Sequence, residues 1–234
     1  MSITFLIPIF NEVKTVRKAI EEVIKLDIPS KEIIIIDNNS TDGSKEIIRE
    51  YQKRESIHII FQKKNLGFGN SIQDGFSKSS NDFIFIQYGD LEYEINTSVE
   101  MLMLIKKKNL DVVFASRLKN MKNIKDLIKA LIKKPSYIAT IICTFLVNLL
   151  YDKNFTDIIG TRLYRRKVIL PIIPKTSGQG FDFELASLIS KKNLKFEEVF
   201  IKYKPRKNNS DKKIKFYHMF NAIYGILKIK FFNK

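Results

Sequence analysis

Short apolar runs alternate with amphipathic stretches along most of the chain. Five runs rich in Ile, Val and Phe are too short for buried helices and predict β-strands at 3–10, 32–37, 57–61, 82–88 and 110–115. Between them, apolar residues recur at spacings of three and four over 13–26, and Ser40-Thr41-Asp42 precedes a second helix-like stretch over 43–53. Strands that alternate with helices predict a mostly parallel sheet flanked by helices, an α/β fold.

Polar residues follow three of the predicted strands, as PIFNE at 8–12, DNNSTDG at 37–43 and YGDLE at 88–92. In open α/β sheets, ligands bind beyond the carboxyl ends of the strands, so these segments predict a binding site on one edge. Each has a simpler interpretation, because 37–43 is rich in turn and cap residues and Asp90 and Glu92 can belong to a solvated turn. The binding site is favoured because three separate strand ends place acidic or amide groups on the same edge.

Composition narrows the choice of partner. The 234 residues suffice for one substantial core. Lys and Arg outnumber Asp and Glu by 41 to 25, a net charge of +16, which predicts attraction to nucleic acid, an anionic membrane surface or phosphorylated substrates. We expect no nucleic-acid partner, because the chain has neither a known binding motif nor aromatic residues interleaved with a basic patch. The single cysteine, Cys143, excludes an internal disulfide and a multi-cysteine zinc site, which fits a reducing cytosol.

The motifs occur in the order of a known enzyme family. Along the chain stand IPIFNE, IIIIDNNSTDGS, NLGFGNSIQDGF, QYGDLEYE, ASR, TDIIGTRLYRRKVI and GFDFELASLISKKNLKFEEVFIKYKPR. This series resembles glycosyltransferase family 2, and within it the branch of dolichol- or polyprenyl-phosphate sugar synthases, over residues 3–230. The resemblance implies a GT-A fold and the inverting transfer of a sugar from a nucleotide diphosphate donor. It also implies a Mg²⁺ or Mn²⁺ ion, which stabilises the negative charge of the leaving nucleoside diphosphate.

The resemblance assigns donor-binding roles by position. Asp90 matches the second acid of the family's Asp-x-Asp motif and is expected to act on the metal and the diphosphate, with Glu92 as a second oxygen ligand. Asp37 matches the acid that contacts the nucleotide in relatives. The other expected donor contacts are Pro8, Phe10, Glu12, Asn39, Gly67 and Tyr88. Gly67 belongs to NLGFGN, whose glycines allow a close approach of backbone to the donor, although G-x-G is equally an ordinary turn.

Two positions depart from the family pattern. Tyr88 stands where relatives usually begin the metal motif with Asp, and Asn38 replaces the second acid of the usual Asp-Asp pair. A tyrosine hydroxyl does not replace a carboxylate on Mg²⁺, although it can hydrogen-bond a ribose or a phosphate. Three outcomes are open: a weaker metal site at Asp90 and Glu92, a shifted donor preference, or a catalytically impaired nucleotide-binding scaffold.

The acceptor side is expected to use basic and acidic residues of the second half. The arginines that match basic positions of the family, and are expected to hold an acceptor phosphate, are Arg117, Arg162 and Arg206. A lipid phosphate such as polyprenyl phosphate needs no general base, whereas a glycan hydroxyl in surface polysaccharide synthesis needs one. The candidates for this base are Asp157 and Glu184, with Asp182 as a weaker one.

Two amphipathic stretches predict contact with a membrane. Residues 136–151 carry no charge but are fewer than the roughly 20 needed to span a bilayer, and lysines precede them at helical spacing at 122, 125, 129 and 133. Residues 214–232 are similarly apolar, with a narrow polar stripe. Such helices lie on an anionic membrane surface; a buried core helix or a contact in a homo-oligomer is the alternative.

The domain and location follow from these patterns. We expect a GT-A domain over 1–206 and a basic tail over 207–234 that faces the membrane or a partner. The N-terminal segment lacks the basic start and cleavage site of a signal peptide. The predicted location is therefore cytoplasmic, peripheral on the cytoplasmic face of the membrane.

Overall fold

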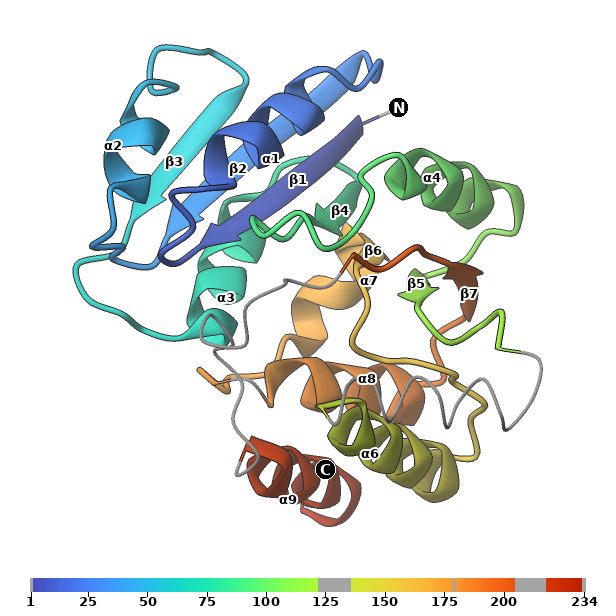
Figure 1. Ribbon diagram of the computed structural model, residues 1–234. Helices are drawn as coiled ribbons and strands as arrows, with labels where there is room; N and C mark the ends of the chain where they lie inside the picture. Colours follow the sequence, from blue (N-terminus) through green and yellow to red (C-terminus); the bar gives the residue numbers. More distant parts are fainter. Residues whose placement is uncertain (1, 122–135, 179, 205–217, 233–234) are drawn as a thin grey trace.

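A seven-stranded sheet runs through the computed structural model, which describes residues 2–121, 136–178, 180–204 and 218–232 (Figure 1). The strands lie in the order β3 (Ile57–Phe61), β2 (Ser30–Asp37), β1 (Ser2–Ile9), β4 (Phe83–Ile86), β6 (Arg162–Arg165), β5 (Val112–Ser116) and β7 (Phe196–Phe200). β6 is antiparallel to β4 and β5, and the other neighbouring pairs are parallel. The predicted mostly parallel sheet is confirmed.

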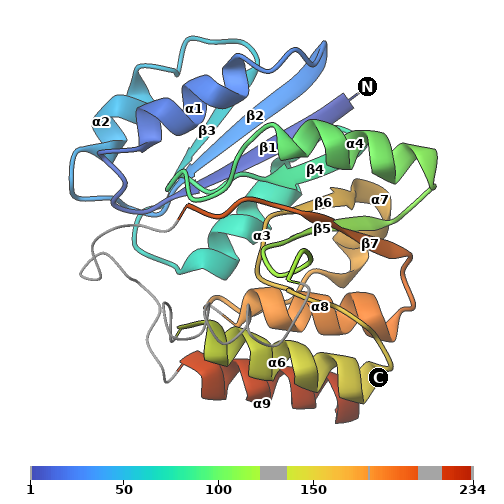
Figure 2. The same ribbon diagram turned by 45° about the vertical axis from the view of Figure 1, so that its right-hand side comes forward.

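Helices cover both faces of the sheet (Figure 2). One face carries α1 (Val16–Ile24), α2 (Ser44–Arg49) and α4 (Thr97–Lys107). The other carries α3 (Phe68–Lys78), α6 (Ser136–Tyr151), α7 (Arg166–Ile169), α8 (Phe181–Lys191) and α9 (His218–Phe231), with the short 3₁₀ helix η1 (Leu170–Ile172) after α7. The helices predicted over 13–26 and 43–53 correspond to α1 and α2.

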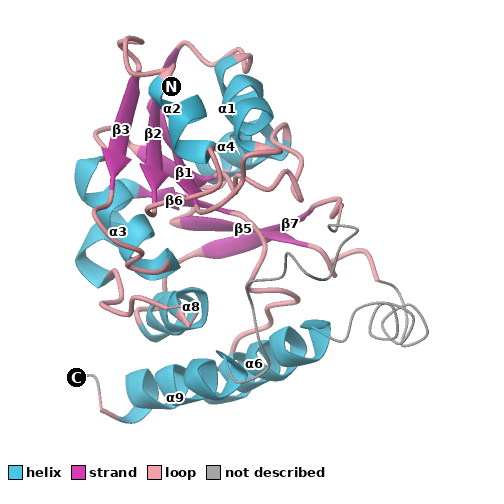
Figure 3. Ribbon diagram, turned by 60° about the vertical axis from the view of Figure 1, so that its left-hand side comes forward, coloured by secondary structure: helices cyan, strands magenta, loops and turns pink. Residues whose placement is uncertain are grey.

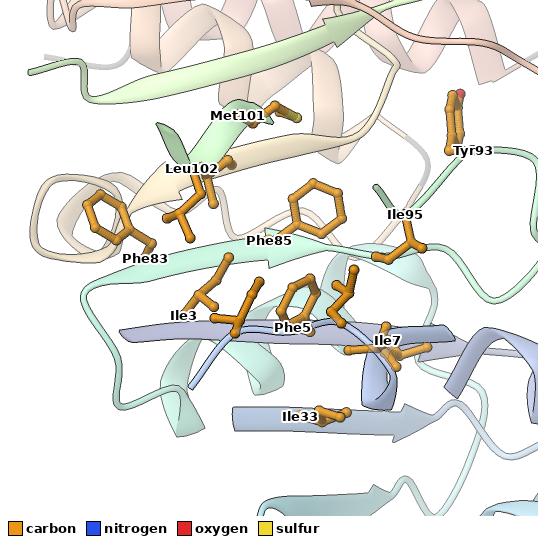
Figure 4. Close-up of a cluster of buried hydrophobic side chains, with 14 of the residues drawn as sticks. Ile3, Phe5, Ile7, Ile33, Phe83, Phe85, Tyr93, Ile95, Met101 and Leu102 are labelled. Atoms are coloured by element: carbon orange, nitrogen blue, oxygen red, sulfur yellow. The ribbon is translucent and has the colours of Figure 1, made fainter. Parts of the chain in front are cut away.

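The central strands are apolar on both faces. In β4, Phe83 and Phe85 point into the core under α1 and α4, whereas Ile84 and Ile86 point into the core under α3 and α8. Figure 4 shows Phe83 and Phe85 in the first of these cores, near Phe5 of β1. Because successive residues of a strand point to opposite faces, a strand buried on both sides is a continuous apolar run. This is the pattern from which the strands were predicted.

The layer farthest from the sheet consists of α6 and α9, which lie side by side beyond α8 (Figure 3). Cys143 and Val147 of α6 and Ala222 and Ile226 of α9 are buried in the same core as α8. The predicted domain end at 206 and the four lysines at 122–133 lie outside the described residues. α9, which belongs to the expected tail, packs against α6 and α8. No described helix combines the length and the apolar character that crossing a bilayer requires.

Candidate active site

The loops after β1 and β2 form one hydrogen-bonded structure. The Asn11 side-chain oxygen accepts a hydrogen bond from the Thr41 N–H at 2.8 Å, and the Asn11 N–H donates to the Ser40 hydroxyl at 3.0 Å. Asn11 and Asn39 adopt left-handed backbone conformations, with φ of 53° and 60°, which asparagine tolerates better than most residues. The two loops predicted to share an edge of the sheet therefore do so, and they fix each other's shape.

Within the second loop, Asp37 and Asp42 have different surroundings. Asp37 is fully buried at the end of β2, and its Oδ1 accepts the Ser40 N–H at 3.2 Å. Asp42 accepts hydrogen bonds from the Ser44 N–H and the Val13 N–H. Burial alone would raise the pKa of Asp42, but these hydrogen bonds and one from the Ser44 hydroxyl lower it overall. Asp42 thus closes the turn that leads into α2, in line with the simpler interpretation, whereas donor binding by Asp37 stays a prediction.

The third segment turns away from the sheet directly over β1. The Gln87 N–H donates to the Leu6 carbonyl at 2.8 Å, and a side chain at Gly89 would lie 2.3 Å from Cδ1 of Ile9. A side chain here would have to displace the end of the Ile9 side chain. The turn therefore places Asp90 beside the end of β1, and Ile9 in turn is the register partner of Asp37. The predicted convergence of Pro8, Asp37 and Asp90 on one edge is what the fold produces.

Asp90 and Glu92 flank a strained residue. Leu91 has a φ of 59°, a left-handed conformation that is unfavourable for leucine and occurs mainly where function or packing demands it. The Asp90 carboxylate accepts a hydrogen bond from the Glu92 N–H at 3.1 Å, which closes the turn. The strand end thus holds two partly exposed carboxylates in a fixed, strained turn.

Tyr88, the first departure from the family pattern, points into the protein. Its hydroxyl accepts a hydrogen bond from Nη2 of Arg162 at 2.9 Å, and its ring stacks on Phe68 with centroids 5.8 Å apart. Burial, and secondarily the Asp182 carboxylate, raise the pKa of Tyr88, so its hydroxyl stays protonated. The hydroxyl therefore has a partner within the protein, and its expected contact with the ribose or a phosphate of the donor stays a prediction.

Arg162 forms a buried ion pair with Asp182. The Arg162 side chain is 1% exposed, and its Nη2 lies 2.8 Å from Oδ1 of Asp182. Burial raises the pKa of Asp182, and the charge of Arg162 only partly offsets this effect. Nε and Nη1 of Arg162 have no hydrogen-bond partner among the described residues. The guanidinium is enclosed with its counter-ion, and the expected contact of Arg162 with an acceptor phosphate stays a prediction.

Arg117 and Asp157 form a second ion pair. Nε and Nη2 of Arg117 donate to the two oxygens of Asp157 at 2.6 and 2.9 Å, and the N–H groups of Arg117 and Ile159 donate to the same carboxylate. Burial alone would raise the pKa of Asp157, but Arg117 and these hydrogen bonds lower it overall. A buried carboxylate that accepts four hydrogen bonds is a weak base, and the role of Asp157 as the general base stays a prediction. Arg117 also lies over the Tyr203 ring, 5.3 Å from its centroid.

Two of the remaining acceptor candidates, Asp182 and Glu184, lie in the first turn of α8. Glu184 lies two residues after Asp182 in α8, about 200° around the helix, and its side chain packs against Gly225 of α9. Asp182 instead faces Tyr88 and Arg162. Arg206 lies outside the described residues.

Asn38, the second departure, has a structural contact. Its amide donates to the Asn65 side chain at 3.0 Å and accepts the Leu66 N–H at 2.8 Å, which ties the β2 loop to the NLGFGN loop. The close approach that Gly67 permits is to the chain itself, since a side chain there would lie 2.5 Å from the Ser177 carbonyl oxygen. A donor contact of Gly67 stays a prediction.

Comparison with known proteins identifies the family. The model of glycosyl transferase family 2 matches residues 4–173. The chain belongs to this family. A cholesterol galactosyltransferase from Borreliella burgdorferi is 32% identical over 179 residues, 72% of this chain and 49% of that protein. A poly-beta-1,6-N-acetyl-D-glucosamine synthase from Staphylococcus epidermidis is 30% identical over 105 residues, 45% of this chain and 26% of that protein. The chain thus spans only about half and about a quarter of these two relatives.

A solved structure supports the fold of this family-2 glycosyltransferase chain. Glucosyl-3-phosphoglycerate synthase from Mycobacterium tuberculosis, in complex with Mn²⁺, uridine diphosphate and glucosyl-3-phosphoglycerate, has a TM-score of 0.69 at 13% identity. The match covers 98% of this chain and 80% of that one. The predicted GT-A fold and family are confirmed, whereas the narrower branch of dolichol- or polyprenyl-phosphate sugar synthases stays a prediction.

Asp90 and Glu92 fit a divalent ion that is completed by other ligands. Among the described residues, no three Asp, Glu, His or Cys side chains come together as a metal site. Mg²⁺ is, however, often held by one or two carboxylates with water and substrate phosphates, so two carboxylates on one turn are a suitable protein contribution. Glu92 is also linked to the segment after β7, because its side chain hydrogen-bonds the Tyr203 hydroxyl and its carbonyl accepts the Lys204 N–H at 2.9 Å. Tyr203 was not predicted at the site, because the strand that it follows was not recognised.

Proposed function

We propose that this protein transfers a sugar from a nucleotide diphosphate sugar to a hydroxyl of a membrane-borne acceptor. The observation that carries the donor side is the convergence of the ends of β1, β2 and β4, which brings Pro8, Asp37 and Asp90 to one edge of the sheet. A nucleotide sugar bound at this edge would lie beyond the carboxyl ends of the strands, which is where open α/β sheets bind their ligands.

The donor roles divide between the loops. Phe10, Glu12, Asp37 and Asn39, on the joined loops after β1 and β2, are suited to the nucleoside end of the donor. Asp90 and Glu92 would hold Mg²⁺ or Mn²⁺, which when bound offsets the charge of the leaving nucleoside diphosphate. The strained turn at Leu91 fixes both carboxylates before the donor binds, so little ordering is left for the reaction itself.

A hydroxyl acceptor is favoured over polyprenyl phosphate by the two ion pairs. Arg117 and Arg162, expected to bind an acceptor phosphate, are each held by a buried carboxylate. The similarity to a cholesterol galactosyltransferase, named for a membrane lipid with a hydroxyl acceptor, supports the same choice. Polyprenyl phosphate, with Arg206 as its partner, and a glycan hydroxyl are the alternatives. A hydroxyl requires a base, and the candidates from the sequence besides Asp157 are Glu184 and, as a weaker one, Asp182.

The impaired-scaffold alternative rests on Tyr88 and Asn38. Tyr88 and Asn38 replaced two acids, but each now has specific hydrogen bonds, Tyr88 to Arg162 and Asn38 to Asn65 and Leu66. Both side chains therefore have defined hydrogen-bond partners within the protein. The carboxylates of Asp37 and Asp90 are retained at the edge of the sheet.

Sugar transfer from labelled donors tests the proposal. Purified protein is incubated with a panel of nucleotide sugars, divalent metal and a total membrane lipid extract, and the organic phase is counted. Acid-stable label supports a glycoside of a hydroxyl, whereas acid-labile label indicates a glycosyl phosphate and thus the polyprenyl-phosphate alternative. Label only in added soluble glycan indicates the glycan alternative. Absence of both transfer and donor hydrolysis with every donor would contradict the proposal.

A further inference from the structure

Exposed apolar side chains are concentrated on α6 and α9. Of the eleven large hydrophobic side chains that are exposed among the described residues, eight belong to these helices or the residue after α9. They are Ile138, Ile142, Phe145, Leu149, Phe220, Tyr224, Phe231 and Phe232, with exposed fractions from 41% to 81%. We call these eight residues the α6–α9 surface. An apolar group of this extent on a soluble domain usually marks an interaction site.

The α6–α9 surface is the outer side of a fixed helix pair. On α6, the buried Cys143 and Val147 are each two residues before the exposed Phe145 and Leu149, about 200° around the helix. The Tyr151 hydroxyl donates to the Ile226 carbonyl at 3.2 Å and links α6 to α9. One side of each helix is therefore buried in the core, and the other side faces away from it (Figure 3).

The charge around this surface favours an anionic occupant. Neither α6 nor α9 contains Asp or Glu, and the last turn of α9 carries Lys228 and Lys230. A second copy of the chain would bring two such surfaces together, each on a protein with a net charge of +16, without a compensating acid on either helix. Lipid headgroups supply the missing negative charge, and aromatic rings such as those of Phe145 and Tyr224 favour the boundary between headgroups and acyl chains.

We propose that the α6–α9 surface docks the protein on an anionic membrane, with its apolar side chains among the lipid headgroups. This inference rests on the surface alone and not on the proposed transfer. It has a consequence for that transfer, because Gly180, at the start of α8, packs against Ala222 of α9. The first turn of α8 also carries Asp182, which reaches Tyr88 at the end of β4 through Arg162. Docking therefore brings the membrane to the side of the protein on which α8 meets the candidate site.

Vesicle flotation with the full chain tests the proposal. Vesicles of phosphatidylcholine with and without phosphatidylglycerol are compared for wild type and the Phe145→Glu, Leu149→Glu double variant. The control is Met103→Glu, which places the same charge at a side chain 61% exposed on α4, on the opposite face of the sheet. Circular dichroism and protection of Cys143 from alkylation verify that each variant is folded.

We expect wild type and Met103→Glu to float only with vesicles that contain phosphatidylglycerol. The double variant should bind these vesicles at least about tenfold more weakly, because two exposed apolar side chains that would enter the lipid become charges that the lipid repels. Equal binding of the double variant, equal binding to neutral vesicles, or no binding of wild type would overturn the inference. A concentration-dependent dimer that the double variant abolishes, without vesicle binding, would instead assign the surface to a second copy. Loss of flotation with intact sugar transfer to a detergent-dispersed acceptor would separate this inference from the proposed function.

Discussion

Replacement of Asp182 by Asn should destabilise the protein by about 3–5 kcal/mol, because it leaves the buried charge of Arg162 without its counter-ion. The side chains of Arg162 and Asp182 are 1% and 9% exposed, so water screens the pair little. With an effective dielectric constant of about 20, unit charges 2.8 Å apart interact by about 6 kcal/mol. Part of this energy is retained, because the new amide of the Asp182→Asn variant and the Tyr88 hydroxyl can still accept hydrogen bonds from Arg162. The expected loss of stability is therefore smaller than the full interaction energy, at about 3–5 kcal/mol.

Urea unfolding followed by circular dichroism measures the effect. The matched control is Glu50→Gln, which breaks the ion pair between Arg17 and Glu50, 2.6 Å apart with both side chains more than half exposed, and should change stability little. The double variant Arg162→Met, Asp182→Leu should recover most of the loss, because no unpaired charge is left in the core. If Asp182→Asn were as stable as Glu50→Gln, the argument for an enclosed ion pair would be refuted.

Three further predictions concern other parts of the fold. Gly69→Ala should lower the free energy of unfolding by about 2 kcal/mol, because its Cβ would lie 2.0 Å from the Thr176 carbonyl oxygen, whereas Gly178→Ala, with open space around it, should have no effect in the same thermal melts. Burial raises the pKa of the Cys143 thiol to about 11. Iodoacetamide should therefore label Cys143 slowly in the folded protein at mildly alkaline pH and rapidly after denaturation. Rapid labelling of the folded protein would contradict the packing of α6. The lowered pKa of Asp157 means that its ion pair stabilises the fold above the ordinary value of 3.8 and that this contribution is lost as pH falls through the folded pKa. Asp157→Asn should therefore destabilise the protein at neutral pH and flatten the acid side of its stability profile, and an unchanged acid side would argue against the pair.

The central strands and the binding edge were predictable because their cause is local. Strands buried on both faces appear as apolar runs, and their polar ends follow directly in the sequence, as at Asp37 and Asp90. β6 and β7 were not predicted, because their sequences, RLYR and FEEVF, contain charged residues and are not continuous apolar runs. With β7 unrecognised, the contact of Tyr203 with Glu92 could not be predicted either.

The roles of the acceptor-side residues could not be predicted because they depend on distant partners. Arg117 and Asp157 are 40 positions apart, and nothing in either motif indicates that they pair. Arg162 and Asp182 come from β6 and the first turn of α8, and Tyr88, which contacts Arg162, follows β4. A motif gives the position of a side chain in the sequence, but packing decides whether that side chain faces a ligand or a counter-ion.

The most direct test of the donor site is calorimetric binding of a panel of nucleoside diphosphates, with and without Mn²⁺, to wild type, Asp90→Asn and Asp82→Asn. Asp82 precedes β4 at the opposite edge of the sheet, so its variant controls for the loss of one acid. We predict selective binding to wild type that Mn²⁺ strengthens, the same binding to Asp82→Asn, and loss of the metal effect in Asp90→Asn. Binding to Asp90→Asn equal to that of wild type, or no binding of any nucleotide to wild type, would contradict a donor site at the ends of β1, β2 and β4.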